Sequence, residues 1–184
     1  MDKNVRITQD FKIMQFQYPY AEKMNPLLEQ EIREAGDSQG YGTKCKCYMT
    51  DYLMRTPAFE TLKTYIIDCV STYVDNAYMW RGSWEIWNMW GLIYKKGDKS
   101  EEHNHWPSMY SFVYYVNSPP GSSPLKFRGH TVKPKNGMLT VFPSNLNHYV
   151  PKHNINKDRI VISGNMSMSI DFIRKNITHS ESCR

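Results

Sequence analysis

The sequence predicts an α+β fold in which a β jelly-roll or barrel is covered on its outside by two helices. Apolar residues at helical spacing are confined to the first half of the chain, whereas short segments rich in β-branched and aromatic residues follow from Ser83 onward. Helices that precede a run of strands, with turns roughly every dozen residues, are typical of α+β folds with a jelly-roll or barrel. At 184 residues, the chain is long enough for one domain with a hydrophobic core and too short to expect two.

We expect a single domain over residues 1–184. It would have an N-terminal strand and helices in 1–82, the strand-rich core in 83–170 and a C-terminal tail in 171–184. The hydrophobic content of 40% and the aromatic content of 14% exclude a disordered chain, because disorder requires little apolar surface to bury. The net charge of +5 is modest and dispersed, which is typical of a solvated basic surface, so a nucleic-acid partner is not expected.

The chain shows no targeting or membrane segment. Residues 1–17 lack the apolar run of a signal peptide, and no stretch reaches the roughly 18 apolar residues of a membrane helix. We therefore expect a cytoplasmic protein without a membrane partner, and the sequence leaves its oligomeric state open. Cysteines occur at positions 45, 47, 69 and 183. The first two are too close for an easy disulfide and lack the second pair of a zinc knuckle, so free thiols are expected.

Three elements are predicted in the first half. Rough alternation of polar and apolar residues over 6–16 predicts an edge strand. A helix is expected to begin at Asn25-Pro26, where an N-cap residue precedes a proline, and to stop at Gly36. A second helix is expected to begin at Thr56-Pro57, because its apolar residues recur every three or four positions up to Tyr73.

Five strands are predicted after Ser83, and turn residues separate them. Asn-Gly, Gly-Asp and Pro-Pro-Gly sequences punctuate the run, as expected between short antiparallel strands. Three tryptophans of the first strand, at positions 84, 87 and 90, are interpreted mainly as core residues, with a place at a substrate mouth left open. The expected strands cover 84–94, 109–116, 124–127, 138–142 and 159–169.

Three histidines form the clearest functional signal. Side chains two positions apart in an extended segment point to the same side, so His103 and His105 can reach one ion. His148 follows a Phe-Pro-Ser turn, where a rigid barrel rim can bring it opposite the pair. First-row metal ions favour imidazole, and three protein ligands leave coordination positions open for a co-substrate and oxygen. This pattern predicts a catalytic metal site, with a chance surface pair as the alternative; His153 is assigned to an exposed loop.

Arg159 begins the last predicted strand and shares a face of it with Ser163 and Asn165. On an inward face, a guanidinium costs several kcal/mol unless it is paired. Its planar fork can bind a carboxylate through two hydrogen bonds, so a dicarboxylic co-substrate that chelates the metal at its other end would satisfy it. Pairing with a protein acid, such as Glu85 or Asp171, is the alternative.

Taken in order along the chain, several motifs resemble those of the iron(II)- and 2-oxoglutarate-dependent oxygenases. The resemblance spans about residues 84–166 and is nearest to an oxygenase family of bacteria and phages related to prolyl hydroxylases. The motifs are Tyr94-Lys-Lys-Gly-Asp98, His103-Asn-His105, Val113-Tyr-Tyr-Val116, Pro134 to Ser144, His148 and Arg159 to Asn165.

The resemblance implies a cupin-like double-stranded β-helix that encloses Fe(II). His103 and His148 match the two iron histidines, Arg159 the residue that binds the distal carboxylate of 2-oxoglutarate, and Tyr94 and Tyr115 tyrosines that contact this co-substrate. Ser163, on the face of Arg159, is a further candidate for co-substrate binding. The implied reaction uses O2 to convert 2-oxoglutarate to succinate and CO2 while a protein side chain, such as that of proline, or a small molecule is hydroxylated.

One position departs from the wider superfamily pattern. His105 stands where most members have an aspartate or glutamate ligand, although the nearer family also shows His-x-His. Either His105 replaces the carboxylate, or Glu101 or Glu102 supplies one. An all-histidine site also suits a cupin-like metal-binding module without oxygenase activity, or a barrel that has lost catalysis.

Overall fold

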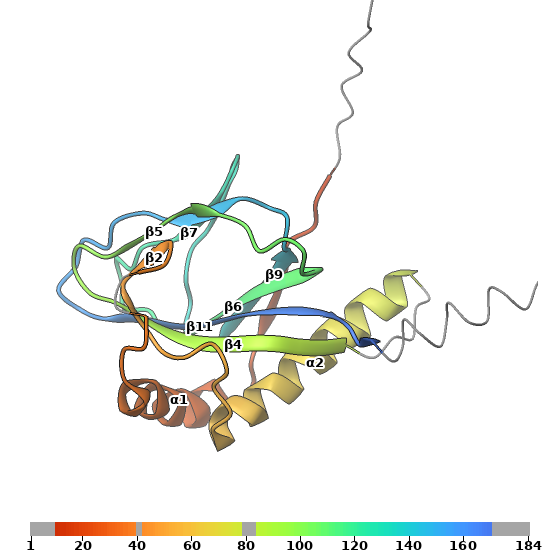
Figure 1. Ribbon diagram of the computed structural model, residues 1–184, viewed down its shortest axis with the longest axis horizontal. Helices are drawn as coiled ribbons and strands as arrows, with labels where there is room; N and C mark the ends of the chain where they lie inside the picture. Colours follow the sequence, from red (N-terminus) through yellow and green to blue (C-terminus); the bar gives the residue numbers. More distant parts are fainter. Residues whose placement is uncertain (1–9, 40–41, 79–83, 171–184) are drawn as a thin grey trace, which may run out of the picture.

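The computed structural model describes residues 10–39, 42–78 and 84–170, and these form two antiparallel sheets with two helices on one side (Figure 1). The larger sheet has the order β1 (Met14–Gln17), β9 (Met138–Pro143), β6 (Tyr110–Asn117), β11 (Arg159–Met168), β4 (Trp84–Tyr94) and β3 (Tyr48–Met49). The smaller sheet has the order β2 (Cys45–Lys46), β5 (Lys99–His103), β10 (His148–Val150), β7 (Leu125–Phe127) and β8 (His130–Val132). This arrangement confirms the predicted double-stranded β-helix.

The two faces of the larger sheet have different partners. Residues alternate across a strand, so Phe112 and Tyr114 of β6 join one apolar cluster and Val113 and Tyr115 join another. The first cluster lies between the sheet and helices α1 (Ala21–Ala35) and α2 (Pro57–Tyr78). The second lies between the two sheets, and the predicted site residues face it.

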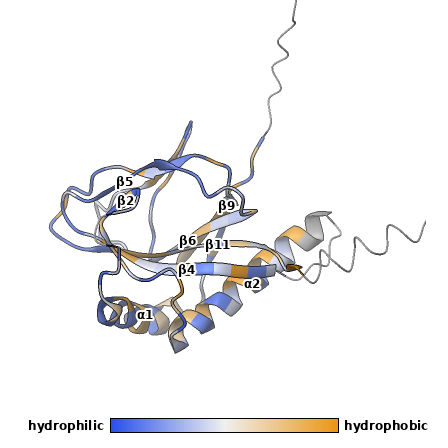
Figure 2. Ribbon diagram, in the orientation of Figure 1, coloured by the Kyte–Doolittle hydropathy of each residue, from blue (hydrophilic) through white to orange (hydrophobic). Residues whose placement is uncertain are grey.

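Both helices cover the outer face of the larger sheet, as predicted (Figure 1). They alternate between blue and orange along their length in Figure 2, as amphipathic helices should. Contact is close where α1 crosses β4, because a Cβ built at Gly91 would lie 2.5 Å from Cγ1 of Ile32. None of the described helices is both long and apolar enough to cross a membrane.

Two predicted boundaries in the first half are wrong. Helix α1 begins at Ala21, so Pro26 lies inside it, and Asn25 does not cap it. The Asn25 side chain instead donates to the Val116 carbonyl oxygen at 2.7 Å and accepts from the Tyr114 hydroxyl at 2.6 Å, which ties α1 to the sheet. The predicted edge strand is confirmed in place but covers only Met14–Gln17 within the described residues.

Helix α2 begins at Pro57 as predicted, but its N-terminus is capped from another element. The Glu31 carboxylate of α1 accepts hydrogen bonds from the Ala58 backbone N–H at 3.1 Å and from the Thr56 hydroxyl. A carboxylate at a helix N-terminus is favourable because it satisfies free N–H groups and interacts well with the helix dipole. Glu31 therefore links the two helices.

The five predicted strands, β4, β6, β7, β9 and β11, occur within one or two residues of their predicted limits, whereas five short strands were not predicted. The missed strands are β2, β3, β5, β8 and β10, each with two to five residues. Segments this short carry too few residues to show an alternating pattern. Two of them, β5 and β10, carry His103 and His148.

The placement of His153 on an exposed loop is wrong, because its side chain is completely buried. One ring nitrogen, Nε2, donates to the Lys157 carbonyl oxygen at 2.7 Å, and the other, Nδ1, accepts from the Ser123 backbone N–H at 3.4 Å. His153 therefore joins two loops and lies outside the histidine cluster. The free-thiol prediction is confirmed for Cys45, Cys47 and Cys69, whereas Cys183 lies outside the described residues.

Candidate metal centre

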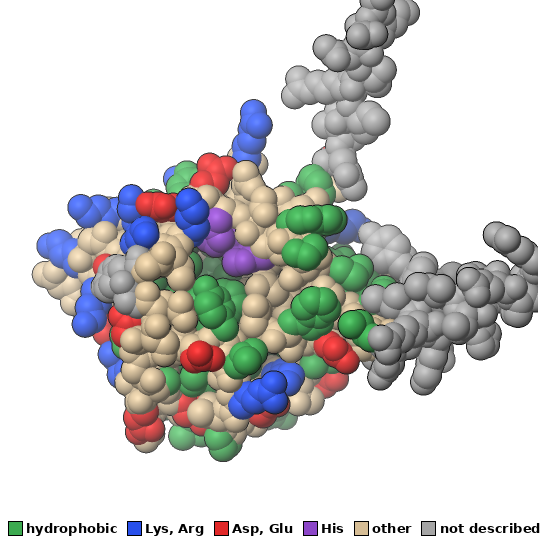
Figure 3. Space-filling view, viewed as in Figure 1, with side chains coloured by type: hydrophobic (Ala, Val, Ile, Leu, Met, Phe, Trp, Pro, Cys, Tyr) green, Lys and Arg blue, Asp and Glu red, His purple; other side chains and the backbone are tan. Residues whose placement is uncertain are grey.

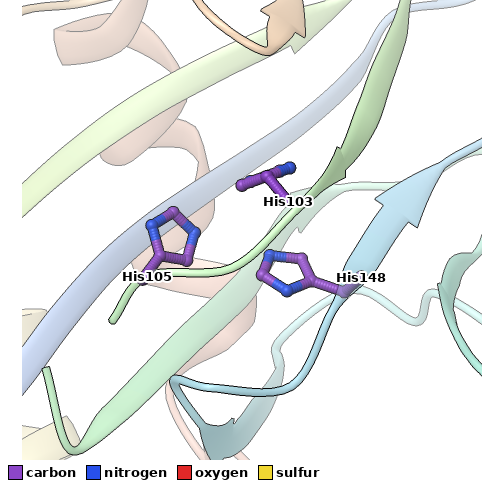
Figure 4. A group of neighbouring side chains, drawn as sticks. All are labelled: His103, His105 and His148. Carbon is purple, nitrogen blue, oxygen red and sulfur yellow. The ribbon is translucent and has the colours of Figure 1, made fainter. Parts of the chain in front are cut away.

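Three histidines from the smaller sheet meet on the inner side of the barrel (Figure 4). His103 ends β5, His105 lies in the segment that follows it, and His148 begins β10, where it pairs directly with His103. Their ring centroids are 4.5 to 5.2 Å apart. Figure 3 shows histidine side chains in a hollow of the surface, with hydrophobic side chains along one side of it.

Two of the rings have a defined tautomer. Nδ1 of His103 lies 2.6 Å from the Glu101 carbonyl oxygen, and Nδ1 of His148 lies 2.9 Å from the Leu146 carbonyl oxygen. Because a carbonyl oxygen only accepts, each Nδ1 must carry the proton. The Nε2 lone pair of each ring is then free to bind a cation, as is usual for histidine ligands whose other nitrogen is hydrogen-bonded.

The cluster is held in the neutral state that metal binding requires. Burial, reinforced by the neighbouring His103, lowers the pKa of His148 to about 3 and that of His105 to about 4. Burial also lowers the pKa of His103, and Lys44 adds to this effect. Each neutral ring keeps one N–H proton and offers the lone pair of its other nitrogen, and these three nitrogens lie close together.

The separation of the ligand atoms fits one metal ion after a small closure. One nitrogen from each histidine lies within 4.8 Å of the others. Nitrogens about 2.1 Å from a single ion, at the angles of a tetrahedral or octahedral site, lie roughly 3.0 to 3.4 Å apart. Binding of one ion to all three rings therefore requires the ligand nitrogens to move closer together. The donor set of three imidazoles suits a first-row metal ion.

The guanidinium of Arg159 lies in the same pocket as the three histidines. Its side chain is 1% exposed, and its Nε and Nη1 atoms have no hydrogen-bond partner within the described part of the chain. The aromatic rings of Tyr94 and Tyr115 lie 4.7 and 5.5 Å from its central carbon. A buried guanidinium with free donors can bind an anion such as a carboxylate.

Two further hydroxyl groups lie near the Arg159 guanidinium, behind the residues that line the pocket. The hydroxyls of Tyr115 and Thr140 are buried and have no hydrogen-bond partner among the described residues. Burial raises the pKa of Tyr115, while Arg159 and Thr140 counteract that rise, so the three groups face one another. Together they offer N–H and O–H donors to a carboxylate.

Tyr94 plays a different part from Tyr115. Its hydroxyl lies 2.6 Å from that of Ser100, which donates in turn to the Cys45 sulfur at 3.2 Å. Because the Ser100 proton is used on Cys45, the Tyr94 hydroxyl must donate to Ser100. That hydroxyl proton is therefore engaged, and Tyr94 supports the Arg159 guanidinium with the face of its ring.

Of the remaining predicted residues, only some lie in the walls of the site. Ser163 and Trp90 line the pocket, and Trp90 Nε1 is buried without a hydrogen-bond partner within the described chain. Trp87 is 52% exposed, and Trp84 lies in the outer apolar cluster. Sequence reasoning missed Thr140 and Ser100, because an isolated hydroxyl in a strand carries no local signal.

The acidic residues near the histidines do not join the cluster. Glu101 forms ion pairs with Lys44 and Lys99, both at 3.8 Å. Glu102 is exposed and accepts a hydrogen bond from Asn147 at 3.2 Å. Glu85 is exposed on β4 and pairs in register with Ser167, eight residues beyond Arg159, whereas Asp171 lies outside the described residues.

Residues 125–165 match the protein family described as "Putative 2OG-Fe(II) oxygenase". This segment contains His148, Thr140 and Arg159, whereas His103 and His105 precede it. No curated protein sequence matches the chain.

Several solved structures share its fold. A viral collagen prolyl hydroxylase from Paramecium Bursaria Chlorella virus-1, in complex with 2-oxoglutarate, is 11% identical with a TM-score of 0.67, over 84% of this chain and 94% of that one. A prolyl-4-hydroxylase from Pseudomonas putida is 17% identical with a TM-score of 0.65, over 85% of this chain and 92% of that one. HygX from Streptomyces hygroscopicus, with nickel and 2-oxoglutarate bound, is 11% identical with a TM-score of 0.62, over 86% and 83%.

The matching family is named for 2-oxoglutarate and Fe(II), and two of these structures contain 2-oxoglutarate, one of them together with nickel. The histidine cluster and the Arg159 guanidinium line one cavity between the two sheets. The chain therefore shares its fold with these structures, and its residues 125–165 are similar to the 2-oxoglutarate- and iron(II)-dependent oxygenase family.

Proposed function

We propose that the protein is a hydroxylase in which His103, His105 and His148 hold Fe(II), and in which Arg159, Tyr115 and Thr140 bind the distal carboxylate of 2-oxoglutarate. The observation that carries this proposal is one pocket lined by both an imidazole cluster and an unpaired buried guanidinium. A dicarboxylate that reaches from one to the other satisfies both at once. When bound, Fe(II), 2-oxoglutarate and O2 supply oxidation of a substrate C–H bond to C–OH, with release of succinate and CO2.

The protein's own residues bind and orient the co-substrate. The guanidinium of Arg159 offers a fork of N–H donors, which matches the geometry of a carboxylate, and the Tyr115 hydroxyl adds a further donor. Because Arg159 is held between two aromatic rings, its direction is set before the co-substrate arrives. Such preorganisation reduces the ordering cost of binding.

Charge complementarity supports a dianionic co-substrate. Three neutral imidazoles leave both charges of a divalent ion uncompensated, and the guanidinium adds a third positive charge in the same pocket. A dianion lowers the electrostatic cost of this arrangement, and the buried site strengthens the attraction. The apolar wall, which includes Val113, Phe142 and Val161, limits the access of water.

We propose a protein side chain, such as that of proline, as the hydroxylated group. Two lines of support are the fold shared with prolyl hydroxylases and the aromatic side chain of Tyr52, which is 36% exposed and contacts Trp90 in the wall of the pocket. A structure of a Trichoplax adhaerens prolyl hydroxylase contains a peptide, whereas one of HygX contains hygromycin B, so both substrate sizes occur on this fold. A small molecule is therefore the alternative substrate.

Succinate formation tests the proposal. The purified chain with Fe(II), 2-oxoglutarate and O2 should form succinate slowly without added substrate, and Arg159→Ala and His148→Ala should each abolish this activity. Arg128→Ala, which changes an exposed arginine, is the matched control and should leave the rate unchanged. Succinate formation that persists in Arg159→Ala would contradict the assigned co-substrate site.

The all-histidine ligand set favours one second candidate, a cupin-like module that binds zinc, nickel or iron without oxygenase activity. In that case the chain would bind these ions with comparable stoichiometry, but 2-oxoglutarate would neither bind nor be consumed. Mass spectrometry of a proline-containing peptide library after incubation would separate the two candidates, because only a hydroxylase adds one oxygen atom to a peptide.

A further inference from the structure

The strand pair that carries two of the histidines has an irregular backbone ladder. His103 pairs with His148 and Ser100 with Val150, and the register shifts between these two pairs. His105 lies beyond the end of β5, where one backbone hydrogen bond, from its N–H to the Ser144 carbonyl oxygen at 2.8 Å, links it to the segment before β10. A short and shifted ladder fixes register weakly.

Side chains on the outer face compensate for this weakness. Since residues alternate along a strand, the neighbours of the inward-facing histidines point away from the site. Asn147, which directly precedes His148, accepts a hydrogen bond from the Asn104 amide at 2.8 Å and donates one to the Glu102 carboxylate at 3.2 Å. We call Glu102, Asn104 and Asn147 the amide clamp.

The amide clamp reaches all three histidines through the backbone. Glu102 and Asn104 flank His103, and Asn104 also precedes His105. The side-chain oxygen of Asn104 accepts from the Trp106 backbone N–H at 3.3 Å, which bends the chain around His105. Both the side-chain oxygen and the side-chain nitrogen of Asn147 therefore form hydrogen bonds that join the two histidine-bearing segments.

We propose that Asn147 is a positioning residue that sets the separation of the three imidazoles, through the amide clamp, and thereby the affinity for the metal ion. This inference rests on the proposed metal site. The chemistry of the amide is essential, because Asn147 must accept on one side and donate on the other. An aspartate at this position could still accept from Asn104, but it would place a carboxylate oxygen against that of Glu102.

The test measures Co(II) binding to the full chain by calorimetry under anaerobic conditions. Asn147→Asp should weaken binding about tenfold, a typical effect of losing a group that orients a metal ligand. On charge alone, a new carboxylate near a cation should strengthen binding. A loss of Co(II) affinity would therefore indicate disturbed ligand geometry, because the added negative charge alone would increase the affinity.

A second substitution should restore the clamp. In the double variant Asn147→Asp with Glu102→Gln, the new amide can donate to the new carboxylate, so Co(II) affinity should return to within about threefold of the wild-type value. Relative to Asn147→Asp, the double variant has one negative charge fewer, and this change alone would weaken cation binding. A recovery of Co(II) affinity would therefore come from the restored hydrogen bond and not from charge. Asn147→Ala, which removes both hydrogen bonds without adding charge, should also weaken binding several-fold.

Asn145→Asp is the matched control, because Asn145 is exposed in the same turn and receives the same change of charge. It should bind Co(II) as tightly as the wild type or more tightly. The visible spectrum of the Co(II)-loaded variants reports ligand geometry, so Asn147→Asp should alter its bands and the double variant should restore them. Melting temperatures without metal should stay within a few degrees for all variants, which separates positioning from folding.

Two outcomes would overturn this inference alone: Asn147→Asp binding Co(II) as tightly as Asn145→Asp, or a double variant as weak as Asn147→Asp. If the wild-type chain bound no Co(II), the proposed metal site would fail, and this inference with it.

Discussion

Arg159 should destabilise the ligand-free protein while enabling it to bind its co-substrate. The guanidinium is 1% exposed, and two of its nitrogens have no partner within the described residues. Removing such an ion from water costs several kcal/mol. The ring faces of Tyr94 and Tyr115, at 4.7 and 5.5 Å, each return about 1 kcal/mol. The remaining cost to the stability of the ligand-free protein is about 2 kcal/mol.

Arg159→Met should therefore raise the free energy of unfolding of the ligand-free chain by about 2 kcal/mol, because methionine keeps the packing of the side-chain stem without the charge. For a chain of this size, the gain corresponds to a rise in melting temperature of roughly 4 to 8 °C. In the presence of metal and 2-oxoglutarate at about 100 times its dissociation constant, the wild type should gain about 2.7 kcal/mol. At the same 2-oxoglutarate concentration, the variant should gain almost no stability, because it binds the co-substrate much more weakly.

Thermal unfolding with and without 2-oxoglutarate measures both effects. Arg128→Met is the control, since the same change at an exposed arginine should alter stability by less than about 0.5 kcal/mol. Loss of several kcal/mol in ligand-free Arg159→Met would refute the reasoning, because it would mean that the guanidinium already has a strong internal partner.

Four further outcomes are expected. Tyr115→Phe should raise the dissociation constant of 2-oxoglutarate about tenfold in calorimetry, since it removes a buried donor, whereas Tyr94→Phe should change it less than threefold because the ring under the guanidinium remains. His105→Asp should keep one metal ion per chain and raise succinate formation without added substrate; metal content and turnover equal to wild type would make His105 a bystander. The metal-free chain should lose stability in urea as the pH falls below about 6.5, because burial holds the pKa of His105 at about 4 and that of His148 at about 3, so the unfolded chain takes up protons first. Gly164→Ala should cost about 1 to 3 kcal/mol in the same urea assay, because the added Cβ would lie 2.4 Å from an aromatic carbon and 2.5 Å from a backbone oxygen.

The long strands could be predicted because their own residue types indicate buried β-structure, without information from distant parts of the chain. Trp84 to Tyr94 and Arg159 to Met168 are long, rich in β-branched and aromatic residues, and bounded by turn residues, so their limits lie close to those observed. Helix α1 shows the limit of local signals. Asn25-Pro26 has the sequence of a helix start, yet the side-chain amide of Asn25 forms hydrogen bonds with Tyr114 and Val116, which are distant in the sequence.

In the candidate site, too, some residues could be predicted from local sequence and others could not. The spacing of His103 and His105 alone places both rings on one side of an extended segment, and their cluster with His148 follows the register of β5 and β10. Thr140 is different, because its hydroxyl matters only through its neighbours Tyr115 and Arg159 on other strands. Such residues cannot be identified before the strand order is known.

Fe(II) and 2-oxoglutarate should bind together in the pocket lined by the three histidines and Arg159. Anaerobic addition of Fe(II) and then 2-oxoglutarate to the chain should produce a weak visible charge-transfer band that saturates at one equivalent of each, with no band in His148→Ala. In Arg159→Met, the band should appear only at much higher 2-oxoglutarate concentration. A wild-type chain that binds Fe(II) but gives no such band at any concentration of 2-oxoglutarate would contradict the account.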